Sequence, residues 1–338
     1  MIDNEQNLAF ELDPKKWTRK CPLFGVRFKF AGFFFCPKIR IIIGRMKEKN
    51  GKISVRKIQF GALLGLAFIA VFVWSVAASE NRGHNLRVAF LDVGQGDAIY
   101  IQAPNGNSAL IDGGPPSGKT LSELGRILPF YDRDIDVIIA THPDQDHIGG
   151  LPGVLKRYSA QVLVESDLYS GNGVYEAMEM IAEKNGAQKV IARAGETITL
   201  AQNVTLQILY PEKKFPPAAE TNLSSVVVKL TYGNISFLFT GDLPSEQEIH
   251  LAEKYGTALH ANVLKFGHHG SKTSTSPEFL ALVAPEYGVV SVGADNKYGH
   301  PNKEILDLAE KAEVKVLRTD MEGRIVFETD GTMLSLVK

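Results

Sequence analysis

Cysteine is almost absent from this chain of 338 residues. The two cysteines, Cys21 and Cys36, lie near the start, and residues 60 to 338 contain none. This absence excludes a disulfide framework and a thiolate metal site from most of the chain. A metal bound there must take histidine, carboxylate, amide or water as its ligands. Short repeats and low-complexity tracts are also missing, which excludes a repeat architecture.

Excess positive charge is missing from the larger part of the sequence. The formal net charge of −1 hides an asymmetry, because residues 1–59 hold 14 Lys and Arg against 5 Asp and Glu, and residues 60–338 hold 23 against 33. The acidic part lacks the broad basic surface of a protein that grips many phosphates. Interleaved aromatic and basic residues, typical of a channel that stacks single-stranded nucleic acid, are not evident either.

One apolar run separates the basic tail from the acidic body. Residues 60–78 form nineteen positions without a charge, which is long enough to span a bilayer. The flank at 46–59 carries more Lys and Arg than the residues after the run, so the body is predicted to face outward. We therefore predict a single transmembrane helix at 60–78, a cell-membrane location and an extracytoplasmic body.

Two other interpretations of the apolar run stay open. It is also compatible with a buried core helix or with a signal peptide that begins at Met46 and is cleaved after Ala77 or Ala78, which would secrete the body. Residues 1–45 show no sustained period, and residues 1–59 are predicted to be a basic, poorly ordered tail whose true start could be Met46. Residues 79–85 would be a linker.

The body, residues 86–338, predicts alternating strands and helices. Residues 87–114 read as three short strands, the last two forming a hairpin around Asn105, Gly106 and Asn107. Helical and strand patterns then alternate, and a similar series starts at Ser224. Two such halves favour an α/β fold in which two sheets pack together with helices outside.

Polar residues gather where the predicted strands end. Five of the eight histidines lie there, as do four acids that adjoin glycine-rich turns: His142, His147, His268, His269 and His300 with Asp112, Asp144, Asp146 and Asp242. Carboxylates brought to one edge repel each other unless a cation compensates them. Mixed imidazole and oxygen ligands suit Zn or Mn, so this pattern predicts a metal site.

These motifs carry a resemblance to a known family. HPDQDH at 142–147 is similar to the HxHxDH signature of the metallo-β-lactamase superfamily, with Asp144 in place of the second histidine. Together with FLDVGQGDAIYI, LIDGG, TNLSSVVVKL, FLFTGDL, LKFGHHGS and SVGADNKYGHP, in this order, it resembles the C-terminal domain of ComEC-type competence proteins over residues 86–338. The multi-helix channel of those proteins has no counterpart here, so competence channel proteins are expected only as partners.

The resemblance implies an αββα sandwich with two divalent metal ions, Zn or Mn, at one edge. His142 and Asp144 would hold the first ion, Asp146 and His147 the second, and Asp242 would bridge the two. One histidine of the HHG pair would complete the second site, with His268 preferred to His269. The alternative is a degenerate scaffold that binds no metal.

Other residues receive supporting roles under this resemblance. Catalytic roles fall to Asp146, to Lys265 as a cation that stabilises developing charge, and to His300 as a proton donor to the leaving group or a brace for its loop. Residues predicted to orient the ligands by hydrogen bonds are Asp112, Thr141, Asn222, Ser271 and Asn296.

The implied activity is hydrolysis of a phosphodiester, with single-stranded DNA as the leading substrate. Three alternatives remain: a phosphodiester of an envelope polymer or of choline phosphate, a carboxylic ester or lactone, and a non-catalytic DNA-binding or adaptor module. Asp144 weighs against lactam cleavage, because lactam-cleaving members of the superfamily typically keep the second histidine.

Overall fold

The structure is a computed structural model that describes residues 9–11, 55–80, 85–169 and 171–337. The chain divides into two compact units, one of Met1–Glu11 with Gly83–Lys338 and one of Leu12–Arg82. The first of these, which we call the larger unit, contains all the predicted site residues. Its elements are described first, and the helix of the second unit is described by itself.

The larger unit is built on two eight-stranded sheets. Sheet A has the spatial order β1 (Ala9–Glu11), β8 (Thr197–Ala201), β9 (Val204–Tyr210), β10 (Val227–Tyr232), β11 (Ile235–Phe239), β12 (Val263–Lys265), β13 (Tyr287–Val290) and β14 (Lys315–Arg318). Sheet B has the order β16 (Leu334–Leu336), β15 (Ile325–Thr329), β2 (Leu86–Phe90), β3 (Ile99–Gln102), β4 (Ser108–Ile111), β5 (Asp134–Ala140), β6 (Ser159–Glu165) and β7 (Gln188–Ile191).

The two sheets face each other through aromatic side chains. Phe90 of β2 and Phe327 of β15 come from sheet B, and Phe237 and Phe239 come from β11 of sheet A. The ring centroids of Phe90 and Phe239 are 6.1 Å apart, and those of Phe237 and Phe327 are 6.0 Å apart. All four side chains are buried. Inward positions alternate with positions that face the helices, as expected for a sheet covered on both faces.

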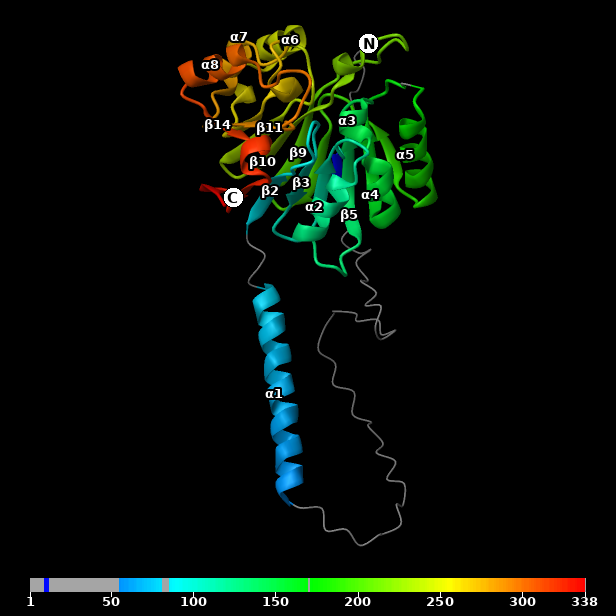
Figure 1. The fold of residues 1–338 in the computed structure, drawn as a ribbon, viewed down its shortest axis with the longest axis vertical. Helices are drawn as coiled ribbons and strands as arrows, with labels where there is room; N and C mark the ends of the chain where they lie inside the picture. Colours follow the sequence, from blue (N-terminus) through cyan, green and yellow to red (C-terminus); the bar gives the residue numbers. More distant parts are fainter. Residues whose placement is uncertain (1–8, 12–54, 81–84, 170, 338) are drawn as a thin grey trace, which may run out of the picture. The chain divides into compact units, whose positions relative to one another are not determined.

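Helices cover the outer face of each sheet (Figure 1). Those of sheet B are α2 (Lys119–Ile127), α3 (Gln145–Ile148), α4 (Leu151–Arg157) and α5 (Gly173–Lys184). Those of sheet A are α6 (Ser245–Tyr255), α7 (Pro277–Val283) and α8 (Lys303–Lys311), and the short helix α9 (Thr319–Glu322) directly follows β14. Separate apolar clusters join each set to its own sheet, so the predicted αββα sandwich is confirmed.

The topology brings the polar motifs to one edge. Strands β4 to β7 are parallel to one another, as are β11 to β14, so their carboxyl ends lie on the same side of each sheet. Asp112 follows β4, Thr141 and His142 follow β5, Asp242 follows β11 and the HHG pair follows β12. The predicted clustering at strand ends is therefore a consequence of parallel pairing.

Two strands lie outside the predicted pattern. Strand β16 adds an antiparallel edge to sheet B, and β1 pairs in parallel with β8. Residues 9–11 belong to the segment predicted as a poorly ordered tail, so part of that segment joins the larger unit. The rest of the predicted tail, apart from the start of α1, lies outside the described residues, as does most of the predicted linker.

Helix α1 (Val55–Glu80) occupies the predicted apolar run and begins five residues before it. Its described side chains, residues 61–74, are exposed and include Phe68 and Trp74. Within the described part of the chain, no helix combines the length and apolarity required to cross a membrane. The predicted transmembrane helix is therefore not confirmed.

Candidate active site

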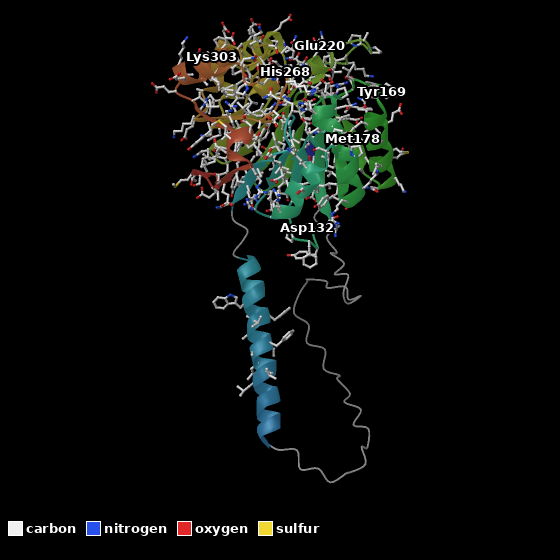
Figure 2. All side chains as sticks on the ribbon, viewed as in Figure 1. Asp132, Tyr169, Met178, Glu220, His268 and Lys303 are labelled. Atoms are coloured by element: carbon white, nitrogen blue, oxygen red, sulfur yellow. The ribbon has the colours of Figure 1, made fainter. Side chains whose placement is uncertain are left out.

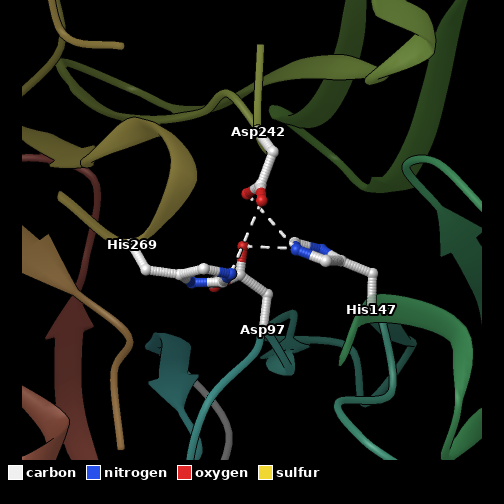
Figure 3. A group of neighbouring side chains, drawn as sticks. All are labelled: Asp97, His147, Asp242 and His269. Carbon is white, nitrogen blue, oxygen red and sulfur yellow. Dashed lines mark ion pairs between the residues drawn. The ribbon is translucent and has the colours of Figure 1, made fainter. Parts of the chain in front are cut away.

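Four buried side chains from distant parts of the sequence meet at the carboxyl edge of the sheets. They are Asp97, His147, Asp242 and His269, and one potential ligand atom of each lies within 4.8 Å of the others. Figure 3 shows them converging from four separate segments. We call them the four-residue group. Asp97 precedes β3, His147 lies in α3, Asp242 follows β11, and His269 lies in the short 3-10 turn η4 (Gly267–Gly270).

Asp242 lies between the two imidazoles of the group. One of its carboxylate oxygens is 3.2 Å from His147 Nε2, and the other is 3.5 Å from His269 Nε2. Burial raises the pKa of this carboxyl, but the charges of His147, His269 and Lys265 outweigh burial and hold the pKa well below its ordinary value. Asp242 is therefore an anion, in the place predicted for a bridging ligand.

A second, fully buried carboxylate orients the histidines from behind. Asp112 Oδ2 accepts a hydrogen bond from His147 Nδ1 at 2.7 Å, and it also accepts one from Thr141 Oγ1 at 2.7 Å. Thr141 Oγ1 lies 3.0 Å from His142 Nδ1 and can accept a hydrogen bond from it, so Asp112 orients His142 through Thr141. In their neutral form, this network assigns the Nδ1–H tautomer to both rings, and both Nε2 lone pairs then face the site.

His269 is held in the same manner by another partner. Its Nδ1 donates to the carbonyl oxygen of Ser291 at 2.9 Å. His268 and His269 both have positive φ values, 48° and 55°, which non-glycine residues rarely adopt. This backbone turn buries the His269 ring and leaves the His268 side chain 29% exposed.

Asp97 enters the site because the loop before it approaches helix α3 very closely. Gly96 has φ +123°, and a Cβ atom there would lie 2.0 Å from the carbonyl oxygen of Asp146, so only glycine fits. The Asp97 amide donates to that same oxygen at 3.2 Å. Asp97 is not among the site residues predicted from the sequence. The sequence feature that marks Asp97 is its position directly after Gly-Gln-Gly, and that tripeptide is also common in turns.

Lys265 is a buried cation beneath the carboxylates. Its Nζ lies 2.5 Å from Asp97 Oδ2 and 3.4 Å from Asp242 Oδ1, and it donates to the carbonyl oxygen of Gly241 at 2.8 Å. Burial lowers the pKa of this ammonium, but Asp97 and Asp242 outweigh burial and raise it. The side chain is fully buried, so it is not the solvated lysine that a position at a strand end usually indicates.

The imidazoles divide into two electrostatic classes. Burial lowers the pKa of each, yet Asp242 and Asp112 raise that of His147 well above its ordinary value, and Asp242 and Asp146 raise that of His269 to about 9. His142 has its pKa lowered to about 3 by burial and by the charge of His147. Without a metal ion, protons on His147 and His269 balance the carboxylates, and a bound metal would displace them.

Residues 91–294 match the protein family described as the metallo-beta-lactamase superfamily. The chain belongs to the metallo-beta-lactamase superfamily. It is 30% identical to ComE operon protein 3 of Bacillus subtilis over 309 residues, which cover 86% of this chain and 38% of that protein. It is also 30% identical to the competence protein ComA of Neisseria gonorrhoeae, over 74% of this chain and 33% of that protein.

This chain thus spans about a third of the length of these curated relatives. The predicted resemblance to competence proteins of the ComEC type is confirmed. The crystal structure of the metallo-beta-lactamase fold protein YhfI from Bacillus subtilis has the same fold, with a TM-score of 0.50 at 15% identity. The matched region covers 72% of this chain and all of YhfI.

The side chains fit the metal ions that a superfamily hydrolase binds. The Nε2 atoms of His142, His147 and His269 and the Oδ1 atom of Asp97 are buried, and none has a hydrogen-bond partner among the described residues. Buried polar atoms without partners are costly, and a cation would satisfy all four. Nδ1 held from behind with Nε2 directed inward is the usual arrangement of metal-binding histidines.

Asp144 and Asp146, the two acids of the HPDQDH motif, lie at the solvent side of the group. Asp146 Oδ2 is 3.3 Å from His269 Nε2, and Asp144 Oδ2 is 3.7 Å from His142 Nε2. Both side chains are partly exposed. The structure thus brings the predicted ligands together, but it adds Asp97 to them and reverses the order within the HHG pair. His269, not His268, belongs to the four-residue group; His268 Nε2 is 3.7 Å from Asp242 Oδ2.

The remaining predicted residues lie around the group. Ser271 braces the HHG turn, since its amide donates to the carbonyl oxygen of His268 and its hydroxyl lies 3.0 Å from Thr273 Oγ1. Asn222, in η2 (Thr221–Ser224), has a buried Oδ1 atom without a hydrogen-bond partner among the described residues. His300 contacts the ring of His268, and Asn296 braces the loop that carries His300.

Proposed function

We propose that this chain is a two-metal phosphodiesterase that cleaves DNA, with Mn or Zn as the metal. One observation carries the proposal: the Nε2 atoms of His147 and His269 converge with the carboxylates of Asp97 and Asp242, and the His142 ring lies 4.1 Å from that of His147. The Nε2 atoms of all three histidines are buried and have no hydrogen-bond partner among the described residues. Oxygen ligands outnumber imidazoles when Asp144 and Asp146 are included. This balance favours a harder ion than the all-nitrogen sites that select Zn.

The residues that would hold the ions are His142, His147, His269, Asp97, Asp144, Asp146 and Asp242. Two bound divalent ions supply an activated water at neutral pH and charge stabilisation for both oxygens of an in-line displacement. The protein contributes orientation, because Asp112 and Ser291 fix the rings before substrate arrives.

Asp146 is the residue we place nearest to the reacting water. Burial raises the pKa of its carboxyl, but the neighbouring imidazoles of His269, 3.3 Å away, and His147 outweigh burial and hold the pKa at about 2. The carboxylate is thus ionised at neutral pH, partly exposed and able to accept a hydrogen bond from water and orient it.

Lys265 acts through the carboxylates and does not contact substrate in this proposal. Its ammonium has three protons, and three acceptors surround it: Asp97, Asp242 and the carbonyl oxygen of Gly241. Asp97 and Asp242 therefore keep fixed orientations. This positioning role replaces the predicted stabilisation of developing charge on substrate.

A DNA substrate is supported by similarity to a protein named as an exodeoxyribonuclease. Exodeoxyribonuclease WalJ of Streptococcus pneumoniae is 29% identical over 107 residues, which cover 31% of this chain and 37% of that protein. The acidic body argues for local engagement of a few phosphates and against a long basic groove.

We also propose that α1 attaches the chain to a membrane, because its described side chains are exposed and mostly apolar.

A substrate panel tests this function. Purified protein would be loaded with Mn or Zn and offered bis-p-nitrophenyl phosphate, single-stranded DNA, a choline phosphate ester and nitrocefin. We expect hydrolysis of the first two, and loss of that activity by at least about a hundredfold in Asp146→Asn, by analogy with removal of one oriented group in other active sites. Asp132→Asn is the matched control, because Asp132 lies at the other end of the larger unit from His268 (Figure 2).

The panel also distinguishes the alternatives. Cleavage of the choline ester alone would indicate an envelope substrate, and cleavage of nitrocefin alone would indicate lactam chemistry. Failure to cleave any substrate with either metal would favour an adaptor and contradict the proposal.

A further inference from the structure

Three aromatic rings form a row from the surface to the four-residue group. The ring of Tyr298 is stacked on that of His300, with centroids 5.8 Å apart and an interplanar angle of 26°. His300 meets His268 edge to face at 5.5 Å, and His268 Nε2 is 3.7 Å from Asp242 Oδ2. Exposure decreases along the row, from 69% for Tyr298 to 29% for the His268 side chain and 4% for that of Asp242.

The loop that carries Tyr298 is held in place by one side chain. Asn296 Oδ1 accepts from the amides of Tyr298 and His300 at 3.2 and 3.0 Å, and its Nδ2 donates to the carbonyl oxygens of Gly293 and His300 at 2.9 and 2.8 Å. All four hydrogen-bonding positions of this amide are thereby used. The rings of Tyr298 and His300 are therefore presented by an ordered loop.

The same loop is tied to the turn that bears His268 and His269. The Asn302 amide donates to the carbonyl oxygen of Gly270 at 2.9 Å, and Asn302 Oδ1 accepts from the amide of Lys272 at 2.8 Å. Because both loops are fixed to each other, the distance from the Tyr298 ring to the four-residue group is set by the fold. A ligand bound on the ring would thus be positioned relative to the site.

The surroundings of Tyr298 suit a flat, negatively charged ligand. Among the described residues, His300 is the sole ring in contact with Tyr298. Lys297 and Lys272 are exposed and form no ion pair within the described part of the chain, and the acid closest in sequence, Asp295, is exposed as well. An open aromatic face with unpaired lysines nearby is the combination that binds single-stranded nucleic acid.

We propose that Tyr298 and His300 form a platform that stacks the base of the nucleotide adjoining the scissile phosphodiester. This inference rests on the proposed phosphodiesterase function and narrows its substrate to single-stranded nucleic acid. Stacking uses the π-face that every base has, so the platform selects for the presence of a base and not for its identity. A single open ring does not form the aromatic cage that choline requires.

The test measures coupling between the ring and the base. The substrates are a short thymidine strand and a strand of the same length in which tetrahydrofuran abasic residues replace the nucleosides. The full chain, loaded with Mn, would be assayed for kcat/KM on both strands as wild type, Tyr298→Ala, Tyr298→Phe and Tyr131→Ala. Tyr131 is an exposed tyrosine on the loop before β5, at the opposite edge of the sheet, and serves as the matched control.

We expect wild type to prefer the base-bearing strand by about tenfold or more, as stacking on one aromatic ring allows. Tyr298→Ala should lose most of that preference, and Tyr298→Phe and Tyr131→Ala should retain it. An unchanged preference in Tyr298→Ala would overturn the platform while leaving the phosphodiesterase function intact. If wild type cleaves neither strand, the phosphodiesterase function fails. The platform is then tested by fluorescence anisotropy, which gives the ratio of the affinities for the base-bearing and abasic strands. That ratio should fall in Tyr298→Ala, and an unchanged ratio would overturn the platform.

Discussion

Asp112 illustrates how much of the site depends on a residue that holds no ligand position. Its carboxylate accepts from His147 Nδ1, from the Thr141 amide and from Thr141 Oγ1, which in turn lies against His142. Two of the three buried imidazoles thus depend on one side chain for their tautomer and orientation. Such hydrogen bonds raise the basicity of metal-binding histidines and fix the ring plane.

Replacing Asp112 should weaken metal binding with little loss of folding. We expect Asp112→Asn to reduce affinity for Mn or Zn by about 10- to 100-fold, because Oδ1 and Oδ2 both accept hydrogen bonds and an amide has only one acceptor oxygen. Its NH2 group would oppose either the Thr141 amide or His147 Nδ1–H. Isothermal titration calorimetry measures the change. Asp136→Asn is the control, since Asp136 is also a buried carboxylate of sheet B but lies at the start of β5. Equal losses in both variants would contradict the role of Asp112.

The two neighbouring histidines should behave differently. His269→Ala removes a buried member of the four-residue group, and we expect the protein to lose at least one bound metal ion per chain. His268→Ala removes a partly exposed ring outside the group, and the metal content should remain that of wild type. Inductively coupled plasma mass spectrometry of both variants gives the stoichiometry. Loss of metal in His268→Ala alone would restore the order that the sequence suggested.

The gathering of acids and histidines at strand ends was predictable from the sequence, because these residues come just after apolar runs. The burial of Lys265 was not, because a lysine at a strand end is interpretable only when the carboxylates that surround it are known. Asp97 was missed for a related reason: its neighbour Asp146 is far away in sequence. The choice between His268 and His269 depends on two left-handed backbone conformations, and residue type alone does not specify these.

At the scale of elements, a buried carboxylate links helix α6 to the HHG turn. Glu248 is fully buried, and its two oxygens accept from the amides of Thr275 and Ser276 at 2.8 Å each. Thr275 Oγ1 accepts from the amide of Gly267, the first residue of the turn, at 3.2 Å. Ser276 caps helix α7 through its bond with the Phe279 amide.

Glu248 should make stability depend on pH. Burial raises the pKa of this carboxyl from 4.5 to about 7, so the folded state binds more protons than the unfolded state between these values. Stability is therefore predicted to fall as pH rises from 4.5 to 7 and to be unaffected by this group above that range. Glu248→Gln cannot titrate.

Urea denaturation of wild type and Glu248→Gln at pH 5, 6, 7 and 8, in the presence of chelator, measures this contribution. The free energy of unfolding of wild type should decline relative to that of the variant across the first three values and run parallel to it above pH 7. Parallel curves over the whole range would show that Glu248 does not titrate in this window.

The alternation of strands and helices was largely predictable from the sequence, since the strands from β2 to β15 and the longer helices follow clear apolar periods. Strand β16 was not, because residues 334–336 form a three-residue edge strand with no apolar run beyond it. Strand β1 pairs with β8, a strand nearly 190 residues away, and such pairing leaves no local signal.

At the scale of the whole molecule, charge limits how the protein can hold nucleic acid. Residues 60–338 carry ten more acidic than basic residues, so strand binding should be local to the site. We expect the affinity for single-stranded DNA to depend weakly on salt, with a slope of log K against log salt no steeper than about −1.4, which corresponds to two phosphates. Fluorescence anisotropy in increasing KCl gives the slope, and a value near −4 or steeper would indicate an extended basic surface instead.

Imidazoles and carboxylates from distant segments of the chain are proposed to hold divalent metal ions. Metal analysis of wild type and Asp242→Ala, both purified without added ions, tests this proposal most directly. We expect wild type to contain Mn or Zn at up to two ions per chain, and Asp242→Ala to lose metal clearly while circular dichroism shows that its fold is retained. A wild type that holds no metal, even after equilibration with excess Mn and Zn, would contradict the proposal.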